Sequence, residues 1–451
     1  MSVHMSQPRF LGGSDEPRPL EWVEEVQPEQ APEVLPRAMR VGIVLTMVSL
    51  ILLTRFGLNI GSYGLNFGVP VIYIMIFVGL AKGRFNLDLP GLILYTLFLA
   101  VGAVSLSANL NLGHERDGSF ASLLLLAALY LPFMFLLRPF ELSREAWTWT
   151  MRAFSNLALF VAFVGIFQFC LQFVFNPPWL FDFSPLIPKA LSTDILANSA
   201  IYTGSAYKSN GFFLREPSAF SFLMAFALIC EMAMFKRWAR MGVFTVGLML
   251  SYSGTGLLAL GFGLMFPFGF KTAVRIGIIA VVGLVLVLLF GDALNLSFTL
   301  GRVNEFSSES SSGYIRYVAP MRLIRELIDS DAWTAFVGHG PGTIFHAGRT
   351  YEFHDPTWAK LLYEYGLIGF SACLGLMLYA MSRSHAPVQV RATLFFCWLV
   401  QGGHLLTPEN VLLIYVLLSL WPHPGSERMR RFQGSTMPMT TMQFDEKDPY
   451  G

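Results

Sequence analysis

Most of this chain consists of apolar segments that are long enough to cross a membrane. Its hydrophobic share of 54% and mean hydropathy of +0.54 are too high for a soluble protein of 451 residues. A spanning helix needs about 20 apolar residues to cross a hydrocarbon core of roughly 30 Å, so the sequence predicts an all-α integral membrane protein. About twelve transmembrane helices are expected, at residues 41–58, 67–80, 89–106, 120–137, 153–175, 219–235, 241–250, 257–270, 273–290, 358–381, 392–406 and 411–420.

Two long polar segments, 176–218 and 291–357, interrupt this pattern. In membrane proteins, short cytoplasmic loops carry more Lys and Arg than short loops on the other side. Placing the N-terminus in the cytoplasm puts the Lys and Arg of this chain's short loops inside, with Arg116 as the exception. Both polar segments then form long periplasmic loops. This requires the apolar stretch 241–270 to be two short helices broken at 251–256, where Ser, Gly and Thr favour a turn. A single helix there would place the loops on opposite sides.

The ends of the chain differ from the predicted membrane domain, 41–421. Residues 1–40 are rich in Pro and Glu and predict a disordered cytoplasmic tail, and 422–451 predict a second cytoplasmic tail. The 4 cysteines lie in apolar segments, which favours packing roles over disulfides or metal binding. A net charge of +1 argues against a nucleic-acid partner.

The polar segments contain basic residues that could bind an anion: Lys208 and Arg215 in the first, Arg316 and Arg322 in the second. Apolar residues at helical spacing, Tyr314 among them, predict a surface helix over 313–330. An isolated exposed arginine is usually solvated or touches a lipid headgroup. Several in one cleft would instead suit a pyrophosphate, because guanidinium groups bind its oxygens in pairs. The sequence leaves both readings open.

Two histidines and a glutamate complete the candidates. His354 precedes an expected membrane helix; it is either an interfacial histidine or a general base for a sugar hydroxyl, since imidazole accepts a proton near neutral pH. His339 lies in the glycine-rich stretch 338–342, which predicts a tight turn close to a ligand. Glu216 precedes Pro217 and either starts a helix or contacts substrate. Carboxylate-pair and zinc-hydrolase motifs are missing from the sequence, so no metal ligands are predicted.

Three stretches resemble the bacterial O-antigen polymerase and O-antigen ligase superfamily, the Wzy-type polysaccharide polymerases in particular. They are 208–218, the expected Arg316 helix leading into 338–342, and His354 running on to 366–369. With the many-helix layout, the resemblance covers roughly residues 41–420. The Glu-Pro-Ser beginning at Glu216 is most similar to exopolysaccharide polymerases.

The resemblance implies a GT-C-like membrane glycosyltransferase of the bacterial inner membrane that uses neither metal nor cofactor. Its donor would be an oligosaccharide linked to undecaprenyl pyrophosphate. By similarity, Lys208, Arg215 and Arg316 would hold the pyrophosphate and His354 would activate the acceptor hydroxyl. The wider predicted substrate site includes Glu216, Arg322, His339 and Tyr314. The chain departs from the family at Asp355, where Asn, Ser or Gln is common, and at 253–255, where many relatives have an arginine nearby.

The expected function is polymerisation of lipid-linked repeat units into exopolysaccharide, capsular or O-antigen polysaccharide. Its partners would be the lipid-linked oligosaccharide, membrane lipid, a chain-length regulator and export proteins. A ligase that moves finished glycan onto lipid A core is the alternative, since the two reactions differ only in acceptor. A transporter or flippase is disfavoured, because the charged residues concentrate in the loops rather than within the membrane segments.

Overall fold

The computed structural model describes most of the chain from Leu35 onward. Residues 1–34 lie outside the described part, together with most of 268–308. The predicted tails therefore fall almost entirely outside it, as does nearly all of the predicted segment 273–290. The described residues are 35–60, 63–111, 118–138, 143–192, 201–203, 206–267, 274, 277–278, 309, 311, 313–330, 332–346 and 351–422.

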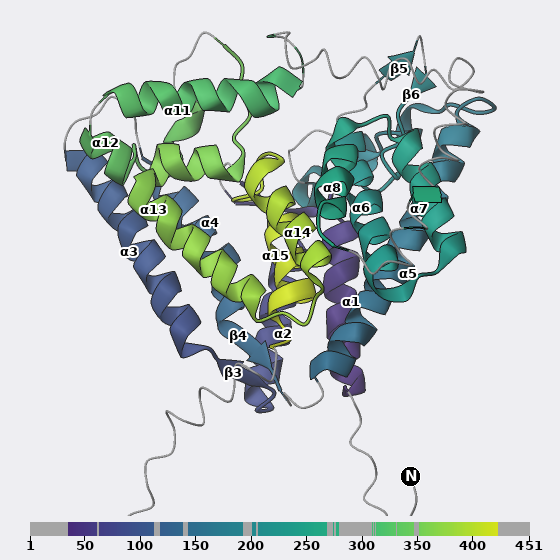
Figure 1. Cartoon of the computed structure of the whole chain (residues 1–451), viewed down its shortest axis with the longest axis horizontal. Coiled ribbons are helices and arrows are strands. Elements are labelled where there is room, and N and C mark those ends of the chain that lie inside the picture. The colour runs from purple at the N-terminus through teal and green to yellow at the C-terminus, as the bar shows by residue number, and fades with distance from the viewer. Residues whose placement is uncertain are drawn as a thin grey trace, which may run out of the picture. The chain divides into compact units, whose positions relative to one another are not determined.

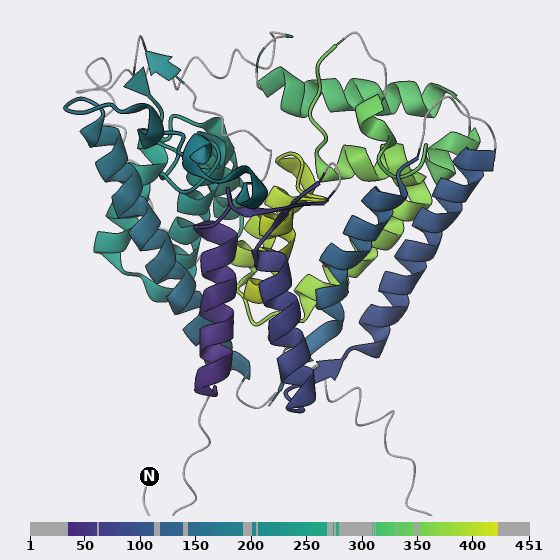
Figure 2. The same cartoon turned by 180° about the vertical axis from the view of Figure 1, so that it is seen from behind.

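This part of the chain is mostly helical (Figures 1 and 2). Most helices run side by side, whereas one, α11, lies across their ends at the top of Figure 1. The helices are α1 (Arg37–Ile51), α2 (Gly68–Ala81), α3 (Leu89–Asn111), α4 (Phe120–Tyr130), α5 (Ser143–Leu171), α6 (Pro217–Cys230), α7 (Trp238–Leu250), α8 (Gly254–Leu264), α11 (Ala319–Ser330), α12 (Ala332–Val337), α13 (Thr357–Ser382), α14 (Val388–Val400) and α15 (Pro408–Ile414).

Four helices are long and apolar enough to cross a membrane: α3, α5, α13, and α6 together with the π-turn that extends it to Phe235. Six further apolar helices among the described residues are shorter. The integral membrane class is thus supported, while the count of about twelve crossings remains a prediction. Several predicted segments are shortened by polar or irregular residues. Segment 392–406, for example, is helical only to Val400, since Gly402 and Gly403 follow.

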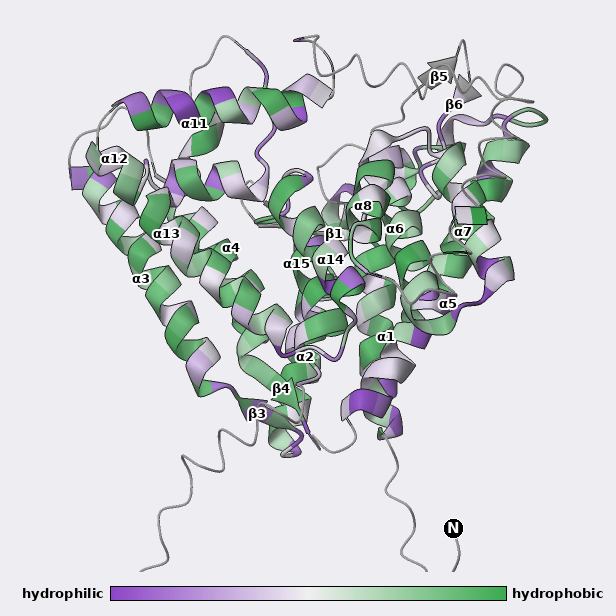
Figure 3. Ribbon diagram, in the orientation of Figure 1, coloured by the Kyte–Doolittle hydropathy of each residue, from purple (hydrophilic) through white to green (hydrophobic). Residues whose placement is uncertain are grey.

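The outer surfaces of the helices fit a lipid environment. Phe77 in α2 is 74% exposed, and Ile74 and Ile93 are 62% and 67% exposed. In water, contiguous apolar exposure of this kind would favour aggregation. Figure 3 shows hydrophobic residues along the middle of α3 and α13 and more hydrophilic residues towards their upper ends.

Among the described residues the strands are short and form antiparallel pairs, two between strands that are neighbours in sequence and one between strands separated by α3 and α4. They are β1 (Gly57–Ile60) with β2 (Tyr63–Asn66), β3 (Phe85–Leu87) with β4 (Phe135–Leu137), and β5 (Ile201–Thr203) with β6 (Ala206–Tyr207). The register of the first pair sets Gly57 opposite Asn66. These pairs connect helices and form no layer of their own.

The predicted break at 251–256 is confirmed. Helix α7 ends at Leu250 and α8 begins at Gly254, and both pack against α6. The backbone N–H of Ser209 donates to the carbonyl of Leu250 at 3.1 Å, which joins the turn to the first polar segment.

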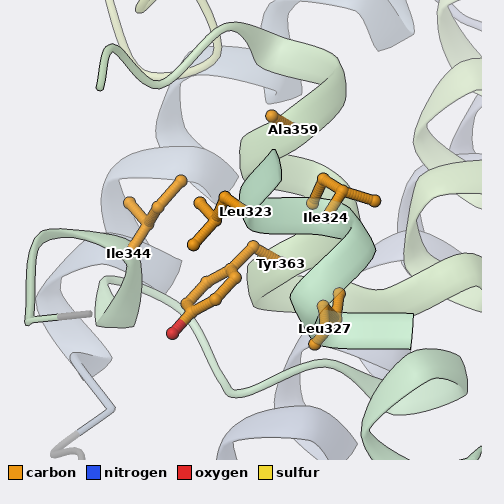
Figure 4. Packing of buried hydrophobic residues seen from close by; sticks show 6 residues of the cluster. All are labelled: Leu323, Ile324, Leu327, Ile344, Ala359 and Tyr363. Atoms are coloured by element: carbon orange, nitrogen blue, oxygen red, sulfur yellow. The ribbon is translucent and has the colours of Figure 1, made fainter. Parts of the chain in front are cut away.

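The predicted surface helix is also confirmed. It begins as one turn of π-helix (Tyr314–Val318, here called the π-turn) and continues as α11. Its packed face differs from the prediction in part. Leu323, Ile324 and Leu327 are buried against Ala359 and Tyr363 of α13 and against Ile344 (Figure 4). The predicted members Met321 and Ile328 are instead 64% and 63% exposed. The π-turn has more residues per turn than an α-helix, which rotates the following side chains away from ideal α-helical spacing.

Candidate functional site

A cavity of about 320 Å³ lies where three separate stretches of chain meet. The first polar segment supplies its last residues, before α6, and the second supplies the π-turn and the residues before α13. The connection between α14 and α15 supplies the third side. The polar lining includes Thr54, Arg215, Glu216, Ser218, Thr255, Arg316, His354, Gln401, His404, Thr407, Glu409 and Asn410.

Arg215 is fixed at the entrance to α6. That helix begins at Pro217, as the Glu-Pro-Ser sequence predicts, because proline suits the first helical position. The Arg215 guanidinium donates two hydrogen bonds to the carbonyl of Thr54, at 3.0 and 2.6 Å. It also pairs with Glu409 of α15 at 3.2 Å. Arg215 thus links the end of α1, the start of α6 and α15.

Arg316 connects the two polar segments. One guanidinium nitrogen donates to the hydroxyl of Thr255 at 3.2 Å, and another lies 3.7 Å from Glu216. Glu216 belongs to the first segment, Thr255 to the start of α8 and Arg316 to the second segment. The two polar segments are therefore in direct contact at this point, while their predicted periplasmic location stays a prediction. Thr255 belongs to a turn for which the sequence indicated no role.

His354 lines the same cavity. Its backbone N–H donates to the carbonyl of Ile315 at 3.0 Å, which holds it beside Arg316. Reduced hydration, followed by the nearby Arg316 guanidinium, lowers the pKa of His354, although part of the side chain stays open to solvent. The Asp355 and Glu216 carboxylates oppose this shift. The imidazole is therefore neutral at pH 7 and can accept a proton.

Asp355, the residue after His354, is itself held by an ion pair. Its carboxylate lies 2.9 Å from the Lys360 ammonium, one turn into α13. It precedes the helix without capping it, because the cap position is Pro356 and no side chain accepts a hydrogen bond there.

The third side of the cavity was missed from the sequence. His404 and Asn410 hydrogen-bond to each other, and both line the cavity with Gln401 and Glu409. Burial lowers the pKa of His404 to about 4, so this imidazole is uncharged at physiological pH. Hydropathy assigned 392–406 to a membrane helix and so hid Gln401 and His404, while Glu409 and Asn410 fell in a short loop with no basic residue. The Gly402-Gly403 pair was the available signal for a loop.

Lys208 does not line the cavity. It is only 7% exposed and lies in a stretch anchored to α5. The Gln168 amide donates to the side-chain oxygen of Asn210 at 2.8 Å, and the Ser209 hydroxyl donates to the carbonyl of Gly165 at 2.9 Å. The first polar segment thus divides between Lys208, packed on α5, and Arg215, in the cavity.

His339 also lies outside the cavity. Its ring stacks on Tyr363 of α13, with ring centroids 4.4 Å apart. The glycine-rich stretch is a tight turn, as predicted, with φ of +81° at Gly338 and +97° at Gly340. The turn packs on protein, since the N–H groups of His339 and Gly340 donate to the carbonyls of Tyr363 and Glu364, each at 2.9 Å. The structure gives this turn a role in joining helices.

Arg322 and Tyr314 are placed elsewhere as well. Arg322 is half-exposed on α11, where it lies 3.4 Å from Glu326 and 4.5 Å from the ring centre of Tyr351. The backbone N–H of Tyr314 donates to the hydroxyl of Ser311. Of the predicted site residues, Arg215, Glu216, Arg316 and His354 share the cavity.

The rest of the lining is apolar. Leu50 and Ile51 of α1, Phe222 and Leu223 of α6, and Leu413 of α15 face the cavity. Apolar helices thus lie beneath a rim of arginine, histidine and carboxylate, which suits a ligand with a hydrocarbon chain and an anionic head. Among the described residues, no group of three or more His, Cys, Asp or Glu side chains could hold a metal ion.

Comparison with known proteins gives no family for this chain. A scan against protein-family models finds no match, and a search of curated proteins finds none either.

Proposed function

We propose that this protein polymerises oligosaccharide repeat units carried on undecaprenyl pyrophosphate, at the periplasmic face of the bacterial inner membrane. The single observation that carries the proposal is the meeting of Arg215, Arg316 and His354 in one cavity above an apolar lining. The three residues are distant in sequence. They combine anion recognition, a proton acceptor and a surface for a lipid chain.

Arg316 is suited to a pyrophosphate because its ion pair with Glu216 is exchangeable. Arg316 and Glu216 are 3.7 Å apart, beyond hydrogen-bond distance, and their side chains are 18% and 37% exposed. A partly exposed pair of this kind contributes only about 0–1 kcal/mol. A pyrophosphate that forms paired, charge-assisted hydrogen bonds would replace it at little cost.

The transfer step uses these groups in the following way. The acceptor hydroxyl oxygen attacks the anomeric carbon of the donor sugar, and the bond from that carbon to the pyrophosphate oxygen breaks. The departing undecaprenyl pyrophosphate keeps the electron pair, and Arg215 and Arg316 stabilise its developing charge. Neutral His354 accepts the hydroxyl proton. The product is a longer glycan on the second lipid carrier.

A product assay tests the proposal. Purified protein in lipid nanodiscs receives lipid-linked repeat units extracted from producing cells that lack this protein, with EDTA present. A ladder of products is expected. A single product that appears only when lipid A core is added would identify a ligase instead. Movement of the intact lipid-linked unit across a vesicle membrane without any new glycosidic bond would identify a flippase.

A further inference from the structure

The cavity wall formed by the α14–α15 connection carries two buried acceptor oxygens that lack hydrogen-bond donors among the described residues. Gln401 is 4% exposed; its amide nitrogen donates to the carbonyl of Thr255 at 2.6 Å, but its Oε1 receives no hydrogen bond. Glu409 is 9% exposed; its Oε1 pairs with Arg215, whereas its Oε2 has no donor. Buried acceptors of this kind are normally satisfied, so both oxygens indicate a missing donor.

A pyrophosphate cannot be that donor. Its ionised oxygens only accept hydrogen bonds, and the Glu409 carboxylate would repel them. The two oxygens therefore suit a different part of the ligand, one that carries O–H groups. The other polar residues of this wall, His404 and Asn410, are uncharged, as a surface for neutral hydroxyl groups would be.

We propose that Gln401 Oε1 and Glu409 Oε2 form a sugar subsite and accept hydrogen bonds from hydroxyls of the glycan carried by the lipid pyrophosphate. This inference rests on the proposed function for the identity of the ligand. The cavity then has two unlike walls. Arg316, on the opposite stretch of chain, faces the phosphates, and the α14–α15 connection selects for a hydroxyl-bearing sugar. Gln401 and Glu409 are positioning residues in this scheme.

Glu409→Gln tests the subsite most directly. The amide oxygen can still face Arg215, while the NH₂ group replaces the free acceptor by a donor and so cannot receive a sugar hydroxyl. Binding is measured without turnover for two probes: lipid-linked repeat units from producing cells, and undecaprenyl pyrophosphate without sugar. We expect affinity for the sugar-bearing probe to fall about tenfold, as for sites that lose a hydrogen bond to a substrate hydroxyl. Affinity for the sugar-free probe should stay the same or rise.

Glu326→Gln is the matched control, since Glu326 also pairs with an arginine but lies outside the cavity. It should bind both probes like the unchanged protein. Gln401→Met is a second variant in case Glu409→Gln does not fold, and it should show the same selective loss. An equal loss for both probes, or no loss for either, overturns the sugar subsite. The binding assay needs no glycosyl transfer. The absence of a product ladder in the separate product assay would therefore count against the proposed polymerase activity and not against the sugar subsite.

Discussion

His339 and His354 come from the same polar segment, yet they lie in unlike surroundings. His354 faces a cavity beside Arg316, whereas the ring of His339 is stacked on Tyr363 and its backbone is bonded to α13. Sequence alone made both residues candidates, His339 through its glycine-rich turn and His354 through its place before an expected membrane helix. The comparison teaches that the element packed behind a histidine decides whether its ring is available to a ligand.

The arginines of this region show the same division. Arg316 sits in the π-turn and reaches the first polar segment, while Arg322, further along the same helical stretch, pairs with its own neighbour Glu326. The helix carries one arginine into the cavity and leaves the other on the surface. The following variants test whether residues that line the cavity act on the substrate while those outside it contribute only to stability.

The largest effect is expected for His354→Ala. Loss of the proton acceptor should reduce kcat of polymerisation by about 10²–10⁴-fold, the usual contribution of a general base. His339→Ala should change kcat by less than about threefold and instead lower the melting temperature, because it removes a stacked ring. Product formation and thermal unfolding of both variants check this. If His339→Ala lost as much activity as His354→Ala at unchanged stability, the division would be wrong.

Arg316→Ala should come next. Removal of one guanidinium from the pyrophosphate should weaken binding of sugar-free undecaprenyl pyrophosphate about 10–100-fold, the range for a lost charge-assisted hydrogen-bond pair. Arg322→Ala is the control and should weaken binding less than about twofold. Titration with the lipid checks both. Equal losses would show that headgroup attraction at the surface, and not the cavity, accounts for binding.

Gly338→Ala should affect stability more than chemistry. Its φ is +81°, and an added Cβ would lie 2.5 Å from the backbone of Glu364, so the turn and α13 must separate. We expect a loss of about 1–3 kcal/mol in the free energy of unfolding. Gly375→Ala, in the open part of the same helix, should be neutral or slightly stabilising. Thermal unfolding in detergent measures both variants. Similar destabilisation by the two would contradict the role of the 338–342 turn in joining helices.

The smallest effect concerns pH. A general base works only when unprotonated, so activity should fall as pH drops through the pKa of His354, which lies below its ordinary value of 6.5. The acid limb of kcat/KM, which reports the free enzyme, should therefore have a midpoint below 6.5. Asp355→Asn removes a carboxylate that raises this pKa, so the midpoint should move to lower pH. A pH profile of both proteins checks the sign, and a shift to higher pH would remove His354 from the step.

The sequence predicted the parts of the fold that depend on local patterns. The break between α7 and α8, the start of α6 at Pro217 and the helix around α11 all follow from turn residues, proline and apolar spacing. The charge distribution predicted that the two polar segments share one side, and Arg316 and Glu216 do lie close together. Arg215, Glu216, Arg316 and His354 could accordingly be proposed together.

What the sequence could not supply depends on long-range packing. Lys208 and Arg215 are close in sequence, and only the anchoring of the Lys208 stretch on α5 separates their roles. His404 was hidden by its apolar neighbours Leu405 and Leu406, which extended the hydropathy signal past the true end of α14. Burial of Glu409 against Arg215 likewise requires two helices to meet in space.

The pairing of Arg215 with Glu409 has a consequence for how the protein is made. Glu409 is in α15, the last helix of the described chain, so a polypeptide still emerging from the ribosome lacks one wall of the cavity. The cavity cannot be complete until that helix lies beside α1. Under the function proposed above, insertion of the last helix would then be a precondition for binding the lipid carrier, and a chain truncated before α15 is expected not to bind it.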